Sequence, residues 1–476
     1  MTVDVQQELP EVESLEERPP WSALFVVLAG AFITVLDFFI VNVAIPSMQH
    51  ELHAGPAAVQ FVVAGFGVAL ASCLITGGRL GDLYGRRRMF SLGVAIFTIA
   101  SAACGFAPSA GTLIAARVLQ GVAAALLTPQ VLAILGAVYT GPHRAKAFNA
   151  YGLVLGLAAV FGQLIGGVLI NADVWGTGWR SIFLINIPFG IVTLILLPRL
   201  VPESRGTGAA RLDLVGTVLV TAGLTAIVLP VVEGRQQGWP LWTWLCLGAA
   251  LPLLAAFAAY QHRLPNRGGS PLIELSLFRE RVFSVGLVTI LVYFMPMGSF
   301  FLVLALYLQQ GRGLSALDSG IIFGLLGIGF FASSAIVQRL AARWGRQVIA
   351  VGALVVSAGY GLLALTVRDI GVGGHLAVLA PGLLIAGFGM GLVASPLPSM
   401  VLAGVRPEHA AAASGVLSTA QQGGAAIGVA VIGMVFYNGL GVRASFGHAF
   451  TVSLVVLVAL SVVVAGLVQL MPRNSR

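Results

Sequence analysis

Charged residues are scarce in this chain, since Lys, Arg, Asp and Glu make up 9% of its 476 residues. A soluble domain carries roughly 25%, so the composition excludes an ordinary soluble protein. Hydrophobic residues reach 58%, and the mean hydropathy is +0.96. Apolar runs of about 20 residues, the length of a membrane-spanning helix, follow one another along almost the whole chain. The sequence therefore predicts an all-α polytopic membrane protein.

Cysteine is also rare. Cys73, Cys104 and Cys246 lie inside apolar runs and form no CxxC pair, which excludes a disulfide framework and a zinc site. The seven His residues lie in or beside predicted loops, so we expect no metal site. No cluster of His, Asp or Glu lies at a predicted membrane face, which argues against a membrane-embedded enzyme.

Fourteen apolar runs, separated by Gly, Pro and charged residues, are long enough to cross a bilayer. Lipid cannot satisfy free backbone groups, so each run is expected to be helical. The runs cover 22–46, 56–77, 89–107, 111–138, 147–170, 181–198, 214–232, 240–260, 283–309, 318–338, 347–366, 376–402, 412–436 and 448–470. They divide the chain into an acidic tail (1–21), a six-helix bundle (22–198), a linker (199–213), two inserted helices (214–260), a linker (261–282), a second six-helix bundle (283–470) and a short tail (471–476).

Basic residues are distributed unevenly between the two sides that these spans define. With the N-terminus inside, 20 of the 26 Lys and Arg fall in inside segments and 5 in outside segments. The positive-inside rule then places both termini, the tails and the linkers in the cytoplasm. The acidic start lacks the basic region of a secretory signal, so we expect the first span to remain as an anchor. A single Lys against 25 Arg, with 60 Gly, indicates a GC-rich bacterial genome and hence a bacterial plasma membrane.

An internal repeat relates two short charged segments. A shift of 260 residues places GRLGDLYGRRR (78–88) on QRLAARWGRQ (338–347), so that Arg79 aligns with Arg339 and Gly85 with Gly345. The ninth span therefore repeats the first. Two similar halves that face a midplane cavity are typical of alternating-access transporters.

ATP is not expected to drive such a transporter directly, because the pattern GxxxxGK[ST] is absent. The pI of about 9.9 is compatible with nucleic-acid binding, but the basic residues are dispersed through short loops instead of gathering on one polar face. We therefore expect the lipid bilayer and a small substrate as partners, with no nucleic acid. We expect no cofactor, because an ion gradient supplies the energy.

Five stretches of the first half carry a family resemblance: LDFFIVNVAIP (36–46), GRLGDLYGRRR (78–88), RVLQG (117–121), GLVLGLAAVFGQLIGG (152–167) and GWRSIFLINIPFG (178–190). They resemble motifs of the major facilitator superfamily, specifically its fourteen-span drug:proton antiporter branch of EmrB/QacA type. The second half is similar through YLQQGRGLSALDSG (307–320) and ASGVLSTAQQGGAAIG (413–428). The resemblance implies two six-helix bundles with two inserted helices, and proton-driven export of small amphipathic drugs or antibiotics.

Asp37 is the only acidic residue near the middle of a predicted span, and Arg117 is the only basic residue well inside one. Burial in hydrocarbon favours the protonated form of a carboxyl group. Antiport needs a group that gains a proton on one side and releases it on the other, so we expect Asp37 to alternate between proton and substrate. A buried guanidinium needs an acceptor, so Arg117 is expected to pair with Asp37 and to titrate with it. The alternatives are purely structural hydrogen bonding for both residues.

The charged segment 78–88 is predicted to be a loop. Gly81 and Gly85 would permit a tight turn, and Asp82 would cap the next helix or pair with a basic residue. The resemblance implies that these residues, with Arg86, form a conformational latch between the cytoplasmic ends of the two halves. The repeat has Ala342 where Asp82 stands, so the latch is expected to be one-sided. The alternative is that these charges only set the topology.

The fifth span resembles the antiporter motif of the family. Its glycines are spaced so that helices can approach closely: Gly152, Gly156, Gly162, Gly166 and Gly167. Gln163 stands where the family often has Pro, which leaves the expected kink open and offers a polar contact instead. Helix packing without a functional role is the alternative.

A substrate path is expected between the halves, because the first and ninth spans should face the cavity. The candidates are Phe38, Asn42, Gln120 and Tyr293, and Asn186 is a further polar group near a span. One deep carboxylate favours neutral or monocationic lipophilic substrates. A dedicated exporter of one self-produced metabolite, such as an antibiotic or siderophore, stays open, as do a membrane-embedded transferase and a sensor.

Overall fold

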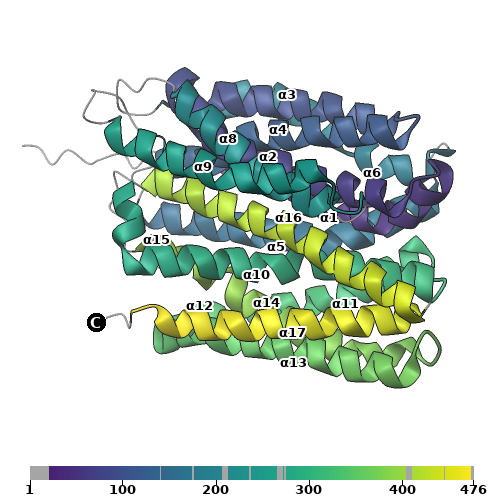
Figure 1. The fold of residues 1–476 in the computed structure, drawn as a ribbon. Helices are drawn as coiled ribbons and strands as arrows, with labels where there is room; N and C mark the ends of the chain where they lie inside the picture. The colour runs from purple at the N-terminus through teal and green to yellow at the C-terminus, as the bar shows by residue number, and fades with distance from the viewer. Residues whose placement is uncertain are drawn as a thin grey trace, which may run out of the picture.

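The computed structural model describes residues 21–139, 141–173, 176–205, 213–234, 237–264, 272, 275–403, 410–443 and 445–472, and all regular structure in these ranges is helical (Figure 1). The predictions for the tail 1–20, for linker residues 206–212 and 265–271 and for 473–476 lie outside the described residues.

The N-terminal half contains α1 (Trp21–Glu51), α2 (Pro56–Tyr84), α3 (Arg86–Gly105), α4 (Ala110–Val138), α5 (Gly141–Ala172), η2 (Gly178–Arg180), α6 (Ser181–Leu184) and α7 (Asn186–Leu200). The inserted pair is α8 (Leu214–Glu233) and α9 (Leu241–Arg263). The C-terminal half contains η4 (Leu275–Arg279), α10 (Arg281–Leu306), the π-helical η5 (Tyr307–Gly311), α11 (Ala316–Ser334), α12 (Val337–Trp344), α13 (Gln347–Ile370), η6 (Leu376–Leu379), α14 (Ala380–Ala394), α15 (Pro396–Ala403), α16 (Ala410–Arg443) and α17 (Phe446–Leu470).

Each of the fourteen predicted spans coincides with helical structure. Within the described residues, twelve helices are long and apolar enough to cross a membrane. A thirteenth candidate is α5, in which the stretches Ala150–Ala159 and Phe161–Ala172 are inclined by 45°. In α8 the described apolar stretch, Leu214–Ile227, is shorter than the other candidate spans. The structure thus has 12 or 13 candidate spans.

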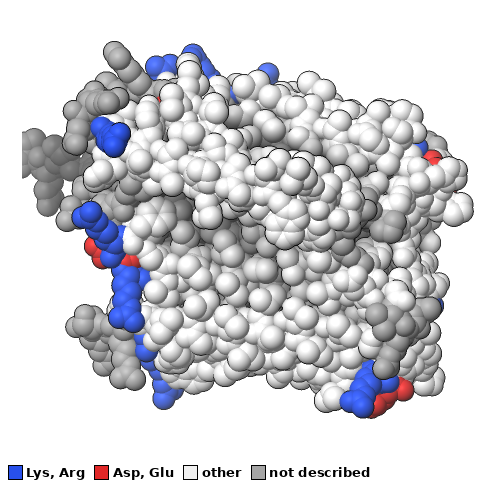
Figure 2. All heavy atoms as spheres, in the orientation of Figure 1, with Lys and Arg blue, Asp and Glu red and all other residues white. Residues whose placement is uncertain are grey.

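The molecular surface matches a lipid environment. The visible face is a broad uncharged band, and Lys and Arg gather mainly at the end that holds the C-terminus (Figure 2). Large apolar side chains such as Phe25, Trp244 and Leu251 are exposed. Apolar surface of this extent is typical of a membrane-embedded protein.

The prediction of a loop over residues 78–88 is wrong, because α2 continues to Tyr84 and α3 begins at Arg86. Only Gly85, with a φ of 109°, breaks the helical path, so the turn is a one-residue junction. Gly81 lies inside α2 and forms no turn. Its lack of a side chain admits Gln130 of α4, whose Oε1 occupies the place where a Cβ would stand.

Buried hydrophobic residues divide the molecule into two unlike ends. Where α1 and α10 end, one continuous cluster includes both halves, as Met48 and Leu308 illustrate. Where α1 and α10 begin, Leu24 belongs to a cluster of the N-terminal half alone. Phe283 belongs at this end to a separate cluster, built from the C-terminal half, the inserted helices and Ile75 of α2. The halves share a core at one end and have separate cores at the other.

Candidate functional site

A buried ion pair lies inside the N-terminal half. Asp37, midway along α1, and Arg117 of α4 are both fully buried, and Nη1 of Arg117 donates to Oδ2 of Asp37. The Nε of Arg117 donates to the carbonyl of Val62 on α2 at 2.9 Å. Its guanidinium carbon lies 4.5 Å from the centre of the Phe66 ring, a favourable cation–π geometry. The expected contact between Asp37 and Arg117 is therefore present, and α2 fixes the guanidinium.

The second carboxylate oxygen has amide partners. Oδ1 of Asp37 accepts from Nδ2 of Asn186 on α7 at 2.7 Å and from Nε2 of Gln120 on α4 at 3.2 Å. Both amides also donate to the hydroxyl of Ser101 on α3, at 3.2 and 2.8 Å. Four helices, α1, α3, α4 and α7, thus converge on one carboxylate.

This network holds a charge that is otherwise costly in a membrane. The two carboxylate oxygens face different partners, a cation on Oδ2 and neutral amides on Oδ1. A proton on Oδ2 would remove the charge that faces Arg117 and leave the amide contacts of Oδ1 in place. The Nη2 of Arg117 already lacks a hydrogen-bond partner among the described residues. The carboxylate is thus held by a cation at one oxygen and by two neutral amides at the other.

Sequence reasoning placed Gln120 on the substrate path, whereas the structure places it inside this network. Ser101 was not anticipated. The sequence shows only that Ser101 is a hydroxyl residue in an apolar run, and such hydroxyls commonly bond to the backbone of their own helix. Only the packing of α3 against α4 and α7 identifies its partners.

The segment 78–88 makes its contacts within the N-terminal half. Arg86 donates to Asp82 at 3.0 Å, so Asp82 pairs one turn along and does not cap α3. The backbone N–H of Arg87 donates to Oε1 of Glu203, after α7, at 3.0 Å. Arg88 lies 3.8 Å from the same carboxylate. Each of these contacts joins residues on the N-terminal side of the inserted helices, and Glu203 was missed because it follows the sixth predicted span.

Glycines of α5 lie in its contacts with two other helices, α1 and α11. Gly162 and Gly166 lie against α1, where a Cβ would approach Leu36 and Ile40. Gly156 and Gly167 lie against α11 of the other half, where a Cβ on Gly167 would come within 2.5 Å of the Ala316 carbonyl oxygen. Gly152 faces open space. The 45° bend of α5 exists although Gln163 replaces Pro.

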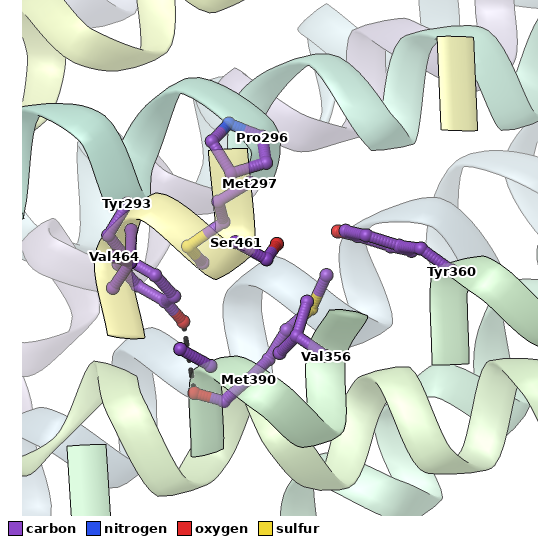
Figure 3. A pocket seen from close by; sticks show the side chains of 9 residues that line it. Tyr293, Pro296, Met297, Val356, Tyr360, Met390, Ser461 and Val464 are labelled. Carbon is purple, nitrogen blue, oxygen red and sulfur yellow. Dashed lines mark hydrogen bonds between the residues drawn. The ribbon is translucent and has the colours of Figure 1, made fainter. Parts of the chain in front are cut away.

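The residues predicted to line the substrate path lie in different parts of the structure. Phe38 lies between the halves, since it and Ala426 of α16 both come within 3.5 Å of a Cβ on Gly67. Tyr293 does not face the other half. Its hydroxyl donates to the Met390 carbonyl at 3.0 Å (Figure 3) and lines a cavity of about 10 Å³ inside the C-terminal half. Because α10 is apolar on nearly every face, its sequence does not indicate which face lies toward the other half.

Comparison with known proteins identifies the family. Residues 27–429 match the family described as the Major Facilitator Superfamily. The chain is 39% identical over 429 residues to the "Probable actinorhodin transporter" of Streptomyces coelicolor, covering 89% of this chain and 74% of that protein. It is 36% identical to the "Puromycin resistance protein pur8" of Streptomyces alboniger, covering 87% and 81%. It is 34% identical to the "Cephamycin export protein CmcT" of Amycolatopsis lactamdurans, covering 93% and 91%.

Solved structures support the same fold. A POT family transporter in complex with 5-aminolevulinic acid superimposes with a TM-score of 0.69 at 14% identity, covering 96% of this chain and 97% of that one. The xylose transporter XylE from E. coli gives a TM-score of 0.63 at 14% identity, covering 94% and 98%. The family match extends over most of the sequence and the relatives exceed 30% identity, so this chain belongs to the major facilitator superfamily.

Proposed function

We propose that this protein is a proton-coupled secondary exporter of small amphipathic compounds, antibiotics among them, in a bacterial plasma membrane. Relatives named for the export of, or resistance to, actinorhodin, puromycin, cephamycin and tetracenomycin C support the substrate class. The fully buried Asp37–Arg117 pair carries the proposal for proton coupling. A proton gradient supplies the energy, with no cofactor.

Asp37 and Arg117 act as one unit in this proposal. Arrival of a proton on Asp37 cancels the charge that holds the guanidinium, and release of the proton restores the pair. Breaking a buried pair costs about 3–5 kcal/mol, whereas 100 mV supplies about 2.3 kcal/mol for each charge that crosses. The remainder has to come from the proton concentration difference, from substrate binding and from new partners for Arg117.

The proposed topology has fourteen spans, with both termini and the segment 78–88 in the cytoplasm. The gathering of basic side chains at the end that holds the C-terminus supports this orientation (Figure 2). The end with one shared core is then the outer end, and the end with separate cores faces the cytoplasm. In this state the contacts of the proposed latch residues, Asp82 and Arg86, to other described residues lie within their own half. They engage the C-terminal half when the cytoplasmic ends close, and the α5 glycines let α5 slide on α1 and α11.

The test uses purified protein in proteoliposomes with a pH-sensitive dye inside. Addition of a transported drug is expected to trigger proton movement with the wild-type protein and none with Asp37→Asn. Drug-triggered proton movement of wild-type size in Asp37→Asn contradicts the proposed role.

A dedicated exporter of one metabolite is the second candidate. Several relatives are named for a single compound, whereas the relative Stp of Mycobacterium tuberculosis is named a multidrug resistance protein. A deletion strain that becomes sensitive to many unrelated drugs favours broad export. Sensitivity to one compound favours the dedicated exporter.

A further inference from the structure

Two side-chain amides share one backbone carbonyl between α1 and α5. Asn42 donates its Nδ2 to the Phe39 carbonyl at 2.9 Å, and Gln163 donates its Nε2 to the same oxygen at 2.6 Å. Asn42 is 1% exposed and Gln163 is fully buried. The two amides are therefore neighbours in an interior where water does not compete for their remaining polar atoms.

The shared partner fixes how both amides are turned. A carbonyl oxygen accepts hydrogen bonds and cannot donate them, so each amide must direct its nitrogen to Phe39. The oxygens, Oδ1 of Asn42 and Oε1 of Gln163, are left over, and neither has a hydrogen-bond partner in the described part of the chain. Unpartnered buried acceptors are rare and unfavourable in proteins. The pair presents two acceptors that need a donor.

The amide pair lies where the two halves meet. The Phe39 ring is 4.8 Å from the Phe301 ring of α10, measured between centres. The backbone oxygen of Gln163 lies 2.8 Å from where a Cβ on Gly320 of α11 would stand. Asn42 is five residues beyond Asp37 on α1, about 7.5 Å along the helix axis. The two acceptors thus lie between the buried ion pair and the end of the molecule that is closed.

We propose that Asn42 and Gln163 form a recognition site for a hydrogen-bond donor, a hydroxyl or an N–H group, on the exported compound. This inference rests on the proposed export function and specifies its substrate class. The compound reaches the amides when α1 and α5 separate from α10 and α11, the movement that alternating access requires. A methyl ether in place of the hydroxyl has no hydrogen to donate to either oxygen, so the site rejects it.

The experiment compares matched probe pairs on the full-length protein in lipid nanodiscs, beginning with 7-hydroxycoumarin and its methyl ether, 7-methoxycoumarin. Equilibrium binding of each compound is measured for the wild type, Gln163→Met and Asn42→Leu. The control variant is Thr34→Val, which removes a buried α1 hydroxyl that bonds its own helix, at the Gly30 carbonyl. Proton-coupled export of the same compounds is measured separately in proteoliposomes.

We expect the wild type to prefer the hydroxyl compounds. A hydroxyl has one hydrogen to donate, so the amide variant that removes its acceptor should lower that preference roughly three- to tenfold, the loss typical of one hydrogen bond. Thr34→Val should leave the preference unchanged. If an amide variant weakens binding of the hydroxyl compound and of its methyl ether equally, the variant has only lost packing and the proposal is overturned. The proposal is also overturned if the wild type binds both compounds of every probe pair equally well. If binding shows the preference but no compound is exported, the export function fails while the recognition site stands.

Discussion

Replacement of Asp37 by Asn separates the stability of the buried pair from its role in transport. The Asn oxygen keeps an acceptor for Asn186 and Gln120, but its NH2 group faces the N–H groups of Arg117, which then lacks its carboxylate partner. Because both side chains are fully buried, the free energy of unfolding is expected to fall by about 3–5 kcal/mol. In the double variant Asp37→Asn/Arg117→Met both charges are gone, so most of this loss should be recovered.

The assay measures thermal or denaturant unfolding of the wild type, both single variants and the double variant in lipid, followed by drug-triggered pH change in proteoliposomes. The double variant is expected to be folded and inactive in proton release. The matched control is Asp82→Asn, whose pairing with Arg86 is partly exposed and should contribute no more than about 1 kcal/mol. A single variant as stable as the wild type refutes the energetic reasoning. A stable double variant that still exchanges protons for drug refutes the coupling role of Asp37.

Two glycine substitutions test close approaches, each with a matched control. Gly167→Val should force α5 away from the α11 carbonyl oxygen that lies 2.5 Å from where its Cβ would stand, which disfavours the closed end about 5- to 150-fold. Distances between spin labels on α5 and α11 should report this change, whereas Gly152→Val, in open space, should resemble the wild type. Gly85→Ala combines a φ of +109° with a Cβ 2.7 Å from the Glu203 carboxyl carbon and should destabilise by about 1–3 kcal/mol. Gly345→Ala, with a φ of +53° and no neighbour within 4 Å among the described residues, should lower the free energy of unfolding by less. An equal loss in both variants would show that crowding by Glu203 does not contribute.

The fold was largely predictable because a bilayer imposes a simple rule on the sequence. Apolar runs of span length must be helical, and each predicted run coincides with helical structure, although 181–198, 318–338 and 376–402 are each divided between two or more helices. Helix ends were less predictable, as α16 shows by extending from Ala410 to Arg443 around the predicted 412–436. Composition marks the part of a helix that crosses hydrocarbon, whereas polar and charged residues continue the helix beyond it. The same effect turned the predicted loop 78–84 into the last turns of α2.

The candidate site was predictable where charge was conspicuous. Asp37 and Arg117 stand out in apolar runs, and neither could be buried alone, so their contact followed from electrostatics. Ser101 carries no such signal, because a hydroxyl in a helix has its own backbone as a ready acceptor. Tyr293, in contrast, was predicted to face the cavity between the halves and does not. An apolar helix presents similar residues on every face, so only packing revealed that this hydroxyl turns toward Met390.

Burial of Asp37 has a consequence for the order of the transport cycle. In this state the carboxylate is fully buried, the halves share one core where α1 ends, and the Gln310 amide of η5 donates to Gln49 of α1 across them. A proton from that side therefore cannot reach Asp37 until this end opens. Opening must separate the Phe39 and Phe301 rings. In the proposed recognition site it would also uncover the oxygens of Asn42 and Gln163, which lack a hydrogen-bond partner among the described residues. Under the proposed function, proton entry and substrate release would both depend on this separation of α1 and α5 from α10 and α11, which would be a physical basis for exchanging one for the other.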